Sequence, residues 1–308
     1  MSRKIFIDCD PGIDDFVAVL AALSMPELEV VGLASVAGNL PVGITTQNLG
    51  KILELAGKTG LAYAQGAEAS LARTPVTAEQ VHGSSGLGSL TLPSPTVRPT
   101  TGDAAAFLYQ CAQKYKGELA VVAIGPLTNL AKAFMAYPGL AALLQEIVIM
   151  GGGHAFGNST PKAEFNIFAD PHAAHIVFES GVPLTIVGLD ATMALGLTPE
   201  ECRSFCPHTP AGTQAAAAFE DILSYSRRYG LGEVAYPHDL TAVVCAAHPE
   251  AFTLLECRVD IELKGSLTFG QTVCDVDGVS KKPKNAKVAM GVAPAAYRQA
   301  LKNALAGI

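Results

Sequence analysis

The sequence contains little charge, no excess of basic residues and no long hydrophobic run. Charged residues make up 16% of the 308 positions and hydrophobic residues 49%, which is typical of a compact folded protein and not of a disordered one. A net charge of −7 provides no basic footprint for nucleic acid or for an anionic membrane. No apolar stretch reaches the roughly 20 residues that cross a bilayer. We therefore expect neither nucleic-acid nor membrane partners.

The marks of secretion are also missing. The opening residues, "MSRKIFIDCD", lead directly into a strand-like run with no signal peptide or cleavage site. The seven cysteines are odd in number and lack the spacing of a disulfide scaffold. Cys202 and Cys206, followed by His208, have no second ligand pair, which favours helical, partly buried thiols over a zinc site. These absences predict a cytoplasmic protein with reduced thiols.

Short apolar runs alternate with amphipathic stretches along most of the chain. The apolar runs predict strands over residues 4–9, 28–36, 118–125, 146–150 and 182–189. The amphipathic stretches predict helices over residues 14–24, 45–56, 126–137 and 171–180. Because the strands are nearly unbroken and rich in β-branched residues, they are typical of a mainly parallel sheet with helices on both faces.

The final third of the sequence has a different pattern. Residues 252–263 and 267–276, separated by "KGS", predict a β-hairpin and thus a small antiparallel addition. Residues 83–101, rich in Gly, Ser and Pro, predict a long functional loop. No linker or repeat interrupts the pattern, so we expect one α/β domain over residues 1–308, with an open, mixed but mainly parallel, Rossmann-like sheet.

Polar and glycine-rich segments follow the predicted strands at their carboxyl ends. These segments are residues 8–15, 38–39, 124–125 and 151–153. In open parallel sheets, ligands bind beyond the carboxyl ends of the strands. The sequence therefore predicts one functional site at this edge of the sheet.

The densest of these segments is "DCDPGIDD", which contains four aspartates. Asp8 and Asp10 are two apart on a strand and share a face, while Asp14 and Asp15 fall in the first turn of a helix, where the dipole favours carboxylates. A solvated, capped turn accounts for Asp14 or Asp15 but not for all four. A hard divalent cation with oxygen ligands does.

A strand-end "DxD" also opens the phosphohydrolases of haloacid dehalogenase type, which use the first aspartate as nucleophile and Mg²⁺ as clamp. The fit to that pattern is loose, because Pro11 follows here where a hydroxyl residue is normal. This alternative stays open at the level of the motif.

With four further stretches, the sequence resembles the nucleoside hydrolases, calcium-dependent enzymes that cleave the N-glycosidic bond of ribonucleosides. The stretches are "VAGN" (36–39), "AIGPLTNLA" (123–131), "MGGGHAFGNSTPKAEFNIFADP" (150–171) and "PHD" (237–239). They occur in the family's order and cover essentially the whole chain. The resemblance implies the nucleoside hydrolase fold, a role in nucleobase salvage and a homodimer or homotetramer. His238 makes the chain similar to inosine/uridine-preferring or pyrimidine-specific members.

The resemblance also implies the roles of individual residues. Ca²⁺ would be bound by the carboxylates of Asp10, Asp15 and Asp239 and by the carbonyl oxygen of Ile124. Asp10 would also be the general base for the calcium-bound water, with Asp8 as a supporting carboxylate. The residues that would bind the ribose are Asp14, Asn39 and Asn166 at its 2′ and 3′ hydroxyls, Asn158 and Glu164 at its 5′ end, and Met150 along the sugar pocket.

The departing base needs a proton donor or another stabilising contact. His238 is the candidate acid, because an ordinary imidazole has a pKa of about 6.5; the alternative is a histidine that only packs beside Asp239. His82 matches a family histidine near the base. Tyr225 and Tyr229, at helical i, i+4 spacing, and Phe165 are candidates to stack on the base, although half-buried helix or core aromatics would look the same.

These residue types suit the chemistry. An N-ribosidic bond breaks through an oxocarbenium-like state, so anionic and amide oxygens beneath the ribose stabilise the transition state more than the substrate. The sequence therefore predicts hydrolysis of ribonucleosides to ribose and free nucleobase. A Mg²⁺-dependent phosphohydrolase and a non-catalytic riboside-binding protein are the alternatives.

Overall fold

Nine strands form one sheet in the residues that the computed structural model describes, 2–100 and 102–308. The strands are β1 (Arg3–Cys9), β2 (Leu28–Ser35), β3 (Tyr63–Gln65), β4 (Leu119–Ala123), β5 (Leu144–Met150), β6 (Leu184–Val187), β7 (Phe252–Ile261), β8 (Thr272–Asp275) and β9 (Ala286–Val292). Their order is β3-β2-β1-β4-β5-β6-β9-β7-β8. The pairings from β3 to β9 are parallel, whereas β7 and β8 are added antiparallel.

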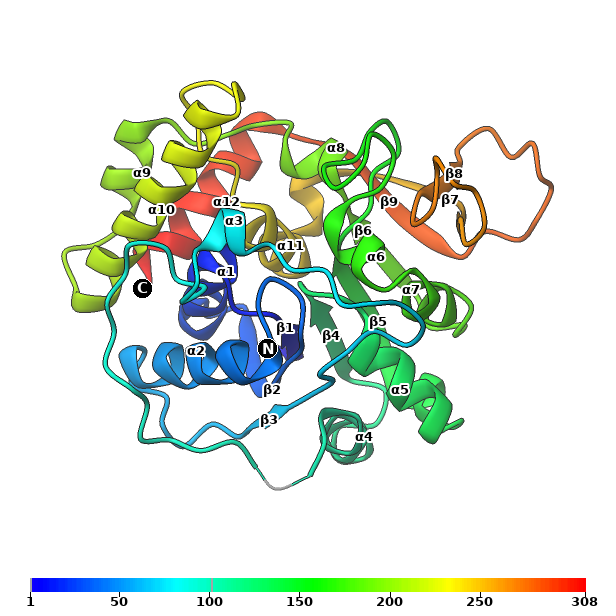
Figure 1. Ribbon diagram of the computed structural model, residues 1–308, viewed down its shortest axis with the longest axis horizontal. Coiled ribbons are helices and arrows are strands. Elements are labelled where there is room, and N and C mark those ends of the chain that lie inside the picture. The colour runs from blue at the N-terminus through cyan, green and yellow to red at the C-terminus, as the bar shows by residue number, and fades with distance from the viewer. Residues whose placement is uncertain (1, 101) are drawn as a thin grey trace.

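Helices cover both faces of this sheet (Figure 1). The longer ones are α1 (Ile13–Ser24), α2 (Val42–Leu55), α4 (Ala104–Lys114), α5 (Thr128–Ala136), α7 (Pro171–Phe178), α10 (Pro210–Arg228), α11 (His238–Ala247) and α12 (Pro294–Ala306). The shorter ones are α3 (Glu79–His82), α6 (Phe165–Ala169), α8 (Leu189–Thr192), α9 (Pro199–Phe205) and the 3-10 turns η1 (Leu140–Leu143) and η2 (Pro249–Ala251).

The strand side chains alternate between two hydrophobic cores. Ile5 and Ile7 of β1 pack with α1, α10, α11 and α12, while Phe6 between them packs with α4, α5 and α7. Successive side chains of a strand point to opposite faces, and here both faces are covered. This is why the central strands are apolar along their length instead of alternating with polar residues.

The strand order of the parallel sheet runs outward in two directions from β1 and β4, which are neighbours at its centre. The chain runs from β1 to β2 and β3 on one side, and from β4 to β5 and β6 on the other. The order 3-2-1-4-5-6 is that of a doubly wound sheet, and the crevice where its direction switches is the expected ligand position. The predicted mixed, mainly parallel Rossmann-like fold is confirmed.

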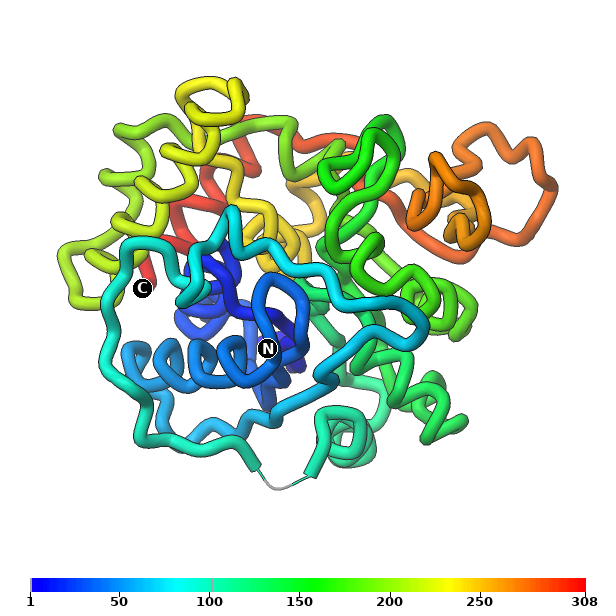
Figure 2. Tube along the Cα trace, in the orientation of Figure 1, coloured from blue at the N-terminus to red at the C-terminus, as the bar shows by residue number. Residues whose placement is uncertain are grey.

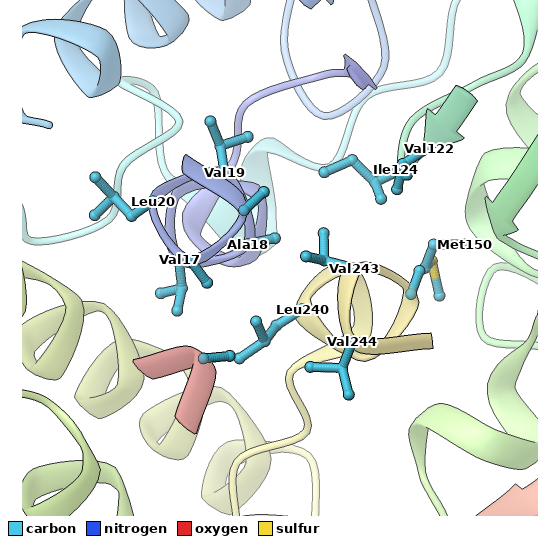
Figure 3. Close-up of a cluster of buried hydrophobic side chains, with 14 of the residues drawn as sticks. Val17, Ala18, Val19, Leu20, Val122, Ile124, Met150, Leu240, Val243 and Val244 are labelled. Atoms are coloured by element: carbon cyan, nitrogen blue, oxygen red, sulfur yellow. The ribbon is translucent and has the colours of Figure 1, made fainter. Parts of the chain in front are cut away.

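Helices α1 and α11 pack against each other beside this crevice. Figure 3 shows Val17 to Leu20 of α1 and Leu240, Val243 and Val244 of α11 beside Ile124 and Met150, which follow or end β4 and β5. The hydrophobic contact sets the two helices side by side against the sheet. Their first turns, which carry Asp14, Asp15 and Asp239, are thereby brought to one place.

Several boundaries differ from the sequence prediction. The hairpin of β7 and β8 exists, but residues 262–271 connect its strands instead of the three residues "KGS". Strand β9 was not predicted, and it lies between β6 and β7, so the antiparallel part joins the main sheet through it. Helix α2 begins at Val42, directly after Pro41 and three residues before the predicted start.

No helix of the described residues is long and apolar enough to cross a membrane.

Residues 83–100, which we call the strap, contain neither helix nor strand. The strap leaves α3, passes around the outside of α2 and leads toward α4 (Figure 2). Thr96 and Val97 near its end donate to Glu54 of α2. The predicted long loop is therefore present over residues 83–100, and it is tied to α2; Thr101, the last residue of the prediction, lies outside the described residues.

Candidate active site

A cavity of about 330 Å³ opens at the switch point of the sheet. Of the residues predicted from the sequence, those that line it are Asp14, Asn39, His82, Ile124, Met150, Asn158, Glu164, Phe165, Asn166, Tyr225, His238 and Asp239. Asp10 and Asp15 are fully buried behind this lining. Tyr229 is absent from the described lining; it is 49% exposed just beyond the end of α10, with its ring 4.5 Å from that of Tyr225.

Three carboxylates meet at one end of the cavity. Asp14, Asp15 and Asp239 each offer an oxygen, and these oxygens lie within 4.8 Å of one another. Asp15 also folds back onto its own turn, because its oxygens accept from the backbone N–H groups of Asp10 (3.1 Å) and Gly12 (3.0 Å). The aspartate-rich turn is thus shaped by one of the carboxylates that it carries.

Asp10 lies next to this group and has one unused oxygen. Its Oδ2 accepts from the backbone N–H of Asn39 at 2.6 Å, while Oδ1 has no hydrogen-bond partner among the described residues. Gly38 and Gly125 make room for it, since a Cβ at either position would overlap an oxygen of the Asp10 carboxylate. The backbone of two strand ends therefore closes tightly around this side chain.

The carboxylate cluster lacks a compensating positive group among the residues that the structure describes. Burial, together with the neighbouring carboxylates, raises the pKa of Asp10 and Asp239 well above the ordinary value and that of Asp15 to about 7. Asp14 Oδ1, like Asp10 Oδ1, has no partner in the described chain. Unused carboxylate oxygens that repel one another are a suitable donor set for a hard divalent cation.

Asp8 belongs to a different network. Its side chain lies on the same face of β1 as Phe6, where Oδ2 accepts from Asn129 Nδ2 at 2.8 Å. The prediction that Asp8 and Asp10 share a strand face is wrong, because β1 ends at Cys9. Asn129, on α5, also donates to the Ser35 carbonyl and accepts from Ala67 N, so it ties β1, β2 and the segment after β3 together. Asp8 thus supports the strand ends and lies outside the group of three carboxylates.

Amide and carboxylate groups after β5 form the next part of the wall. Asn166 Nδ2 donates to the carbonyl oxygens of Ile124 (3.0 Å) and Met150 (3.1 Å) and so links the ends of β4 and β5. Glu164 caps α6 and accepts from the N–H of Gly152 at 2.9 Å. Burial raises the pKa of Glu164 to about 7. Asn158 Oδ1 accepts from Phe165 N at 2.9 Å, which holds the glycine loop against α6.

Two histidines lie on the remaining wall. His82 Nδ1 accepts from the backbone N–H of Ile13 at 3.1 Å, so the proton of its neutral ring is on Nε2. His238 Nδ1 lies 2.7 Å from Thr192 Oγ1. Burial lowers the pKa of both rings, and Asp14 opposes this only in part. For His238, predicted to carry a proton near neutrality, this direction favours the neutral form of the ring.

Further residues at the site were not indicated by the sequence. Thr192 ends the short helix α8, which no pattern marked. Asp221 lines the cavity one helical turn before Tyr225, and its Oδ2 accepts from the strap at Ser89 N (2.8 Å) and Oγ (2.9 Å). The i, i+4 spacing of Asp221 and Tyr225 is a signal that could have placed both on one face of α10.

Comparisons with known proteins identify the family of the chain. A model of the family described as "Inosine-uridine preferring nucleoside hydrolase" matches residues 5–299. The chain belongs to this family. As a nucleoside hydrolase, it is an enzyme that hydrolyses the N-glycosidic bond of ribonucleosides. This confirms the predicted reaction, and the haloacid dehalogenase alternative is dropped.

The similarity extends over the entire length of individual relatives. The hydrolase is 38% identical to the "Non-specific ribonucleoside hydrolase RihC" of Escherichia coli O127:H6 over 306 residues, 99% of each chain. Among solved structures, "Plant nucleoside hydrolase - PpNRh1 enzyme" superposes with a TM-score of 0.92 at 32% identity, covering 99% of both chains. The "Purine-Preferring Ribonucleoside Hydrolase from Gardnerella vaginalis" gives 0.92 at 29% identity, covering 99% of this chain and 98% of that one.

Proposed function

We propose that this nucleoside hydrolase binds Ca²⁺ at the aspartate cluster and uses Asp10 and His238 to cleave nucleosides of several bases, inosine and uridine among them. The observation that carries the proposal is the meeting of carboxylates from the β1–α1 turn and from α11 beside a cavity whose wall presents Asn39 and Asn166. A metal-dependent binding protein for ribosides would need Asp14 and the two amides but no general base.

Asp10, Asp15 and Asp239 would hold the cation together with the carbonyl oxygen of Ile124. When bound, Ca²⁺ would hold the vicinal ribose hydroxyls and lower the pKa of a water molecule. The donor set supports this assignment, since Asp10 Oδ1 has no other partner in the described residues. Asn166 occupies one lone pair of the Ile124 carbonyl and leaves the other available.

The remaining polar wall fits a ribose. We assign Asp14, Asn39 and Asn166 to its 2′ and 3′ hydroxyls, and Asn158 and Glu164 to its 5′ hydroxyl, with Met150 along the ring. Positive charge develops on the sugar as the N-glycosidic bond breaks. The carboxylates stabilise this charge and are already oriented by backbone N–H groups, so little reorganisation is needed in the transition state.

Asp10 is the proposed general base. Its Oδ2 is fixed by Asn39 N, and Oδ1 has two lone pairs, one for the cation and one to accept the proton of the attacking water. Asp15 is less suited to this task because both of its oxygens already accept backbone hydrogen bonds. The different hydrogen bonding of the two buried carboxylates thus supports different roles.

The departing base would meet His238. In the imidazolium form, Nδ1–H would donate to Thr192 Oγ1, and the Nε2 proton could be transferred to a ring nitrogen of the base, which leaves a neutral imidazole. We place His82, Phe165 and Tyr225 around the base as donor or stacking partners, because all three line the cavity. Tyr229 would act only through its contact with Tyr225.

A broad range of bases is supported by the names of the relatives. The matching family is described as inosine-uridine preferring, and the relative that shares 38% identity is described as non-specific. The homodimer or homotetramer and the cytoplasmic location stay predictions.

Release of reducing sugar from a panel of nucleosides tests the proposal. The enzyme is assayed with inosine, uridine, cytidine, adenosine and guanosine after treatment with a chelator, and again after Ca²⁺ or Mg²⁺ is added back. We expect ribose and free base from several of them, and recovery by Ca²⁺. Full activity in the chelator would overturn the cation assignment, and binding without turnover would overturn the catalytic roles.

A further inference from the structure

Asn48 of α2 joins two loops through a single amide group. Its Nδ2 donates to the carbonyl oxygen of Pro11 at 3.2 Å and to that of Ser85 at 2.8 Å. Pro11 lies in the aspartate-rich turn, and Ser85 lies in the strap. Both protons of the amide are therefore used, and Oδ1 accepts from Lys51 Nζ at 3.0 Å. The side chain is fully buried.

The strap runs directly against the turn at this point. Gly86 has a φ of +78°, and a Cβ there would lie 2.8 Å from Asn48 Nδ2 and 3.3 Å from the Pro11 carbonyl oxygen. Only glycine adopts this backbone conformation freely and also leaves the space. Close by, His82 Nδ1 accepts from Ile13 N. The turn is thus held at two points, by Asn48 at Pro11 and by His82 at Ile13.

Proline makes the carbonyl contact important. Pro11 has no N–H, so the backbone of this residue can be anchored by hydrogen bonding only through its carbonyl oxygen. Asp10 precedes it, while Asp14 and Asp15 follow within one helical turn. A rotation of the Pro11–Gly12 peptide would therefore change the direction of the carboxylates on both sides of it.

We propose that Asn48 is a positioning residue for the cation site: by holding the Pro11 carbonyl against the strap, it sets the relative orientation of Asp10, Asp14 and Asp15. This inference rests on the proposed function, because it concerns the cation that we place there. Asn48 touches neither the cavity nor the carboxylates and acts only through the backbone of the turn. Residues that orient metal ligands in this indirect way typically change metal affinity 10- to 100-fold when they are replaced.

The substitution Asn48→Asp separates positioning from charge. Aspartate has the shape of asparagine and keeps the acceptor for Lys51, but it presents an oxygen to the two carbonyls instead of two donors. Its negative charge near the cluster should strengthen Ca²⁺ binding by Coulomb attraction. Loss of the donors should weaken it. A higher Kd for Ca²⁺ would therefore indicate lost positioning, and a lower Kd would indicate the added charge.

Calorimetric titration of the full chain with CaCl₂ alone, at pH 8, provides the test. We expect Asn48→Asp to raise the Kd for Ca²⁺ at least tenfold, and Asn48→Ser, which retains one donor, to raise it less. At saturating Ca²⁺, kcat should recover most of its wild-type value. Thr46→Val is the matched control, because Thr46 is a buried polar residue of the same helix that bonds Ser35 and the Val42 carbonyl.

Each outcome has one meaning. A Kd within twofold of wild type in folded Asn48→Asp, or an equal rise in Thr46→Val, would overturn the positioning role. If Asn48→Asp does not fold, Gly86→Ala tests the same junction from the strap and should raise the Kd in the same direction. Absence of Ca²⁺ binding by the wild type would overturn the proposed cation site itself, and this inference with it.

Discussion

The side chains of Thr192 and His238 form a hydrogen bond of 2.7 Å between Oγ1 and Nδ1. The two residues come from different helices: Thr192 ends α8 after β6, and His238 begins α11. Thr192 is fully buried. The bond fixes the orientation of the imidazole, and the other ring nitrogen is the one available to a ligand. The orientation of His238, the proposed acid, therefore depends on Thr192, which lies outside the "PHD" motif.

Thr192→Val should impair the release of natural bases. Valine has the same shape, so the change removes the hydrogen bond while it largely preserves the packing. We expect kcat for inosine to fall about tenfold with a small change in KM, since a general acid contributes roughly 10²–10⁴-fold and only its orientation is disturbed. Steady-state kinetics measures both parameters.

The leaving group provides the control for this change. A p-nitrophenyl riboside releases an acidic phenol that needs no proton, so its cleavage should be unaffected by Thr192→Val. In a His238→Ala background, Thr192→Val should have no further effect on inosine, because coupled residues are not additive. An equal loss with both substrates would mean that Thr192 serves only the fold.

Asp10→Asn should abolish most turnover without unfolding the enzyme. The amide can still accept from Asn39 N through its oxygen, but it cannot take a proton from water. We expect a fall in kcat of about 10³-fold. Circular dichroism should show an unchanged fold. Binding of inosine to the inactive variant should remain measurable by calorimetry, and retention of full activity would exclude Asp10 as the base.

Removal of Ca²⁺ should destabilise the folded enzyme. A ligand that binds only the native state at about 100 times its Kd stabilises it by about 2.7 kcal/mol. For a chain of this size we expect a Tm roughly 5 °C lower in a chelator than with excess Ca²⁺. Differential scanning calorimetry measures this shift. Asp239→Asn removes one proposed ligand and should reduce the difference in Tm between the two conditions. Asp103→Asn, at the exposed start of α4, is the control and should leave that difference unchanged.

Glu164→Gln should change the dependence of stability on pH. The pKa of Glu164 is about 7 in the folded protein and 4.5 as an ordinary glutamate. Between pH 4.5 and 7 the folded state therefore holds a proton that the unfolded state has released, so this group's contribution to stability falls as pH rises through that range. Glutamine keeps an acceptor for Gly152 N and does not titrate.

The difference between wild type and Glu164→Gln isolates this effect. Urea unfolding at pH 5 and pH 7.5, in a chelator, gives the free energy of unfolding of each protein. Relative to the variant, the wild type should be less stable at pH 7.5 than at pH 5. Parallel pH profiles would show that the Glu164 carboxyl is ionised normally in the folded state.

Much of the fold followed from local pattern. The run from Arg3 to Ser24 contains an apolar strand, a Pro-Gly turn and an amphipathic helix, and each signal is complete within a few residues. The positions of Asp14, Asn39 and Ile124 at one cavity then follow from the rule that parallel strands end at the same edge. Local sequence was sufficient because each of these residues lies next to a strand end.

Other features depend on contacts between distant segments. Strand β9 follows a polar, lysine-rich stretch, and its place between β6 and β7 is set by pairing partners that no short window contains. The lowered pKa of His238 arises from burial, which its sequence neighbours do not reveal. Tyr229 has helical spacing from Tyr225, but α10 ends at Arg228, and Tyr229 is half exposed against the ring of Tyr225.

The long separation of the cluster's carboxylates has a consequence for biosynthesis. Asp14 and Asp15 leave the ribosome early, whereas Asp239 lies more than two hundred residues later and begins α11. A nascent chain that has made only the first six strands cannot assemble the donor set. The cation that we propose for this site would therefore find its complete set of ligands only after α11 has been synthesised and packed against α1.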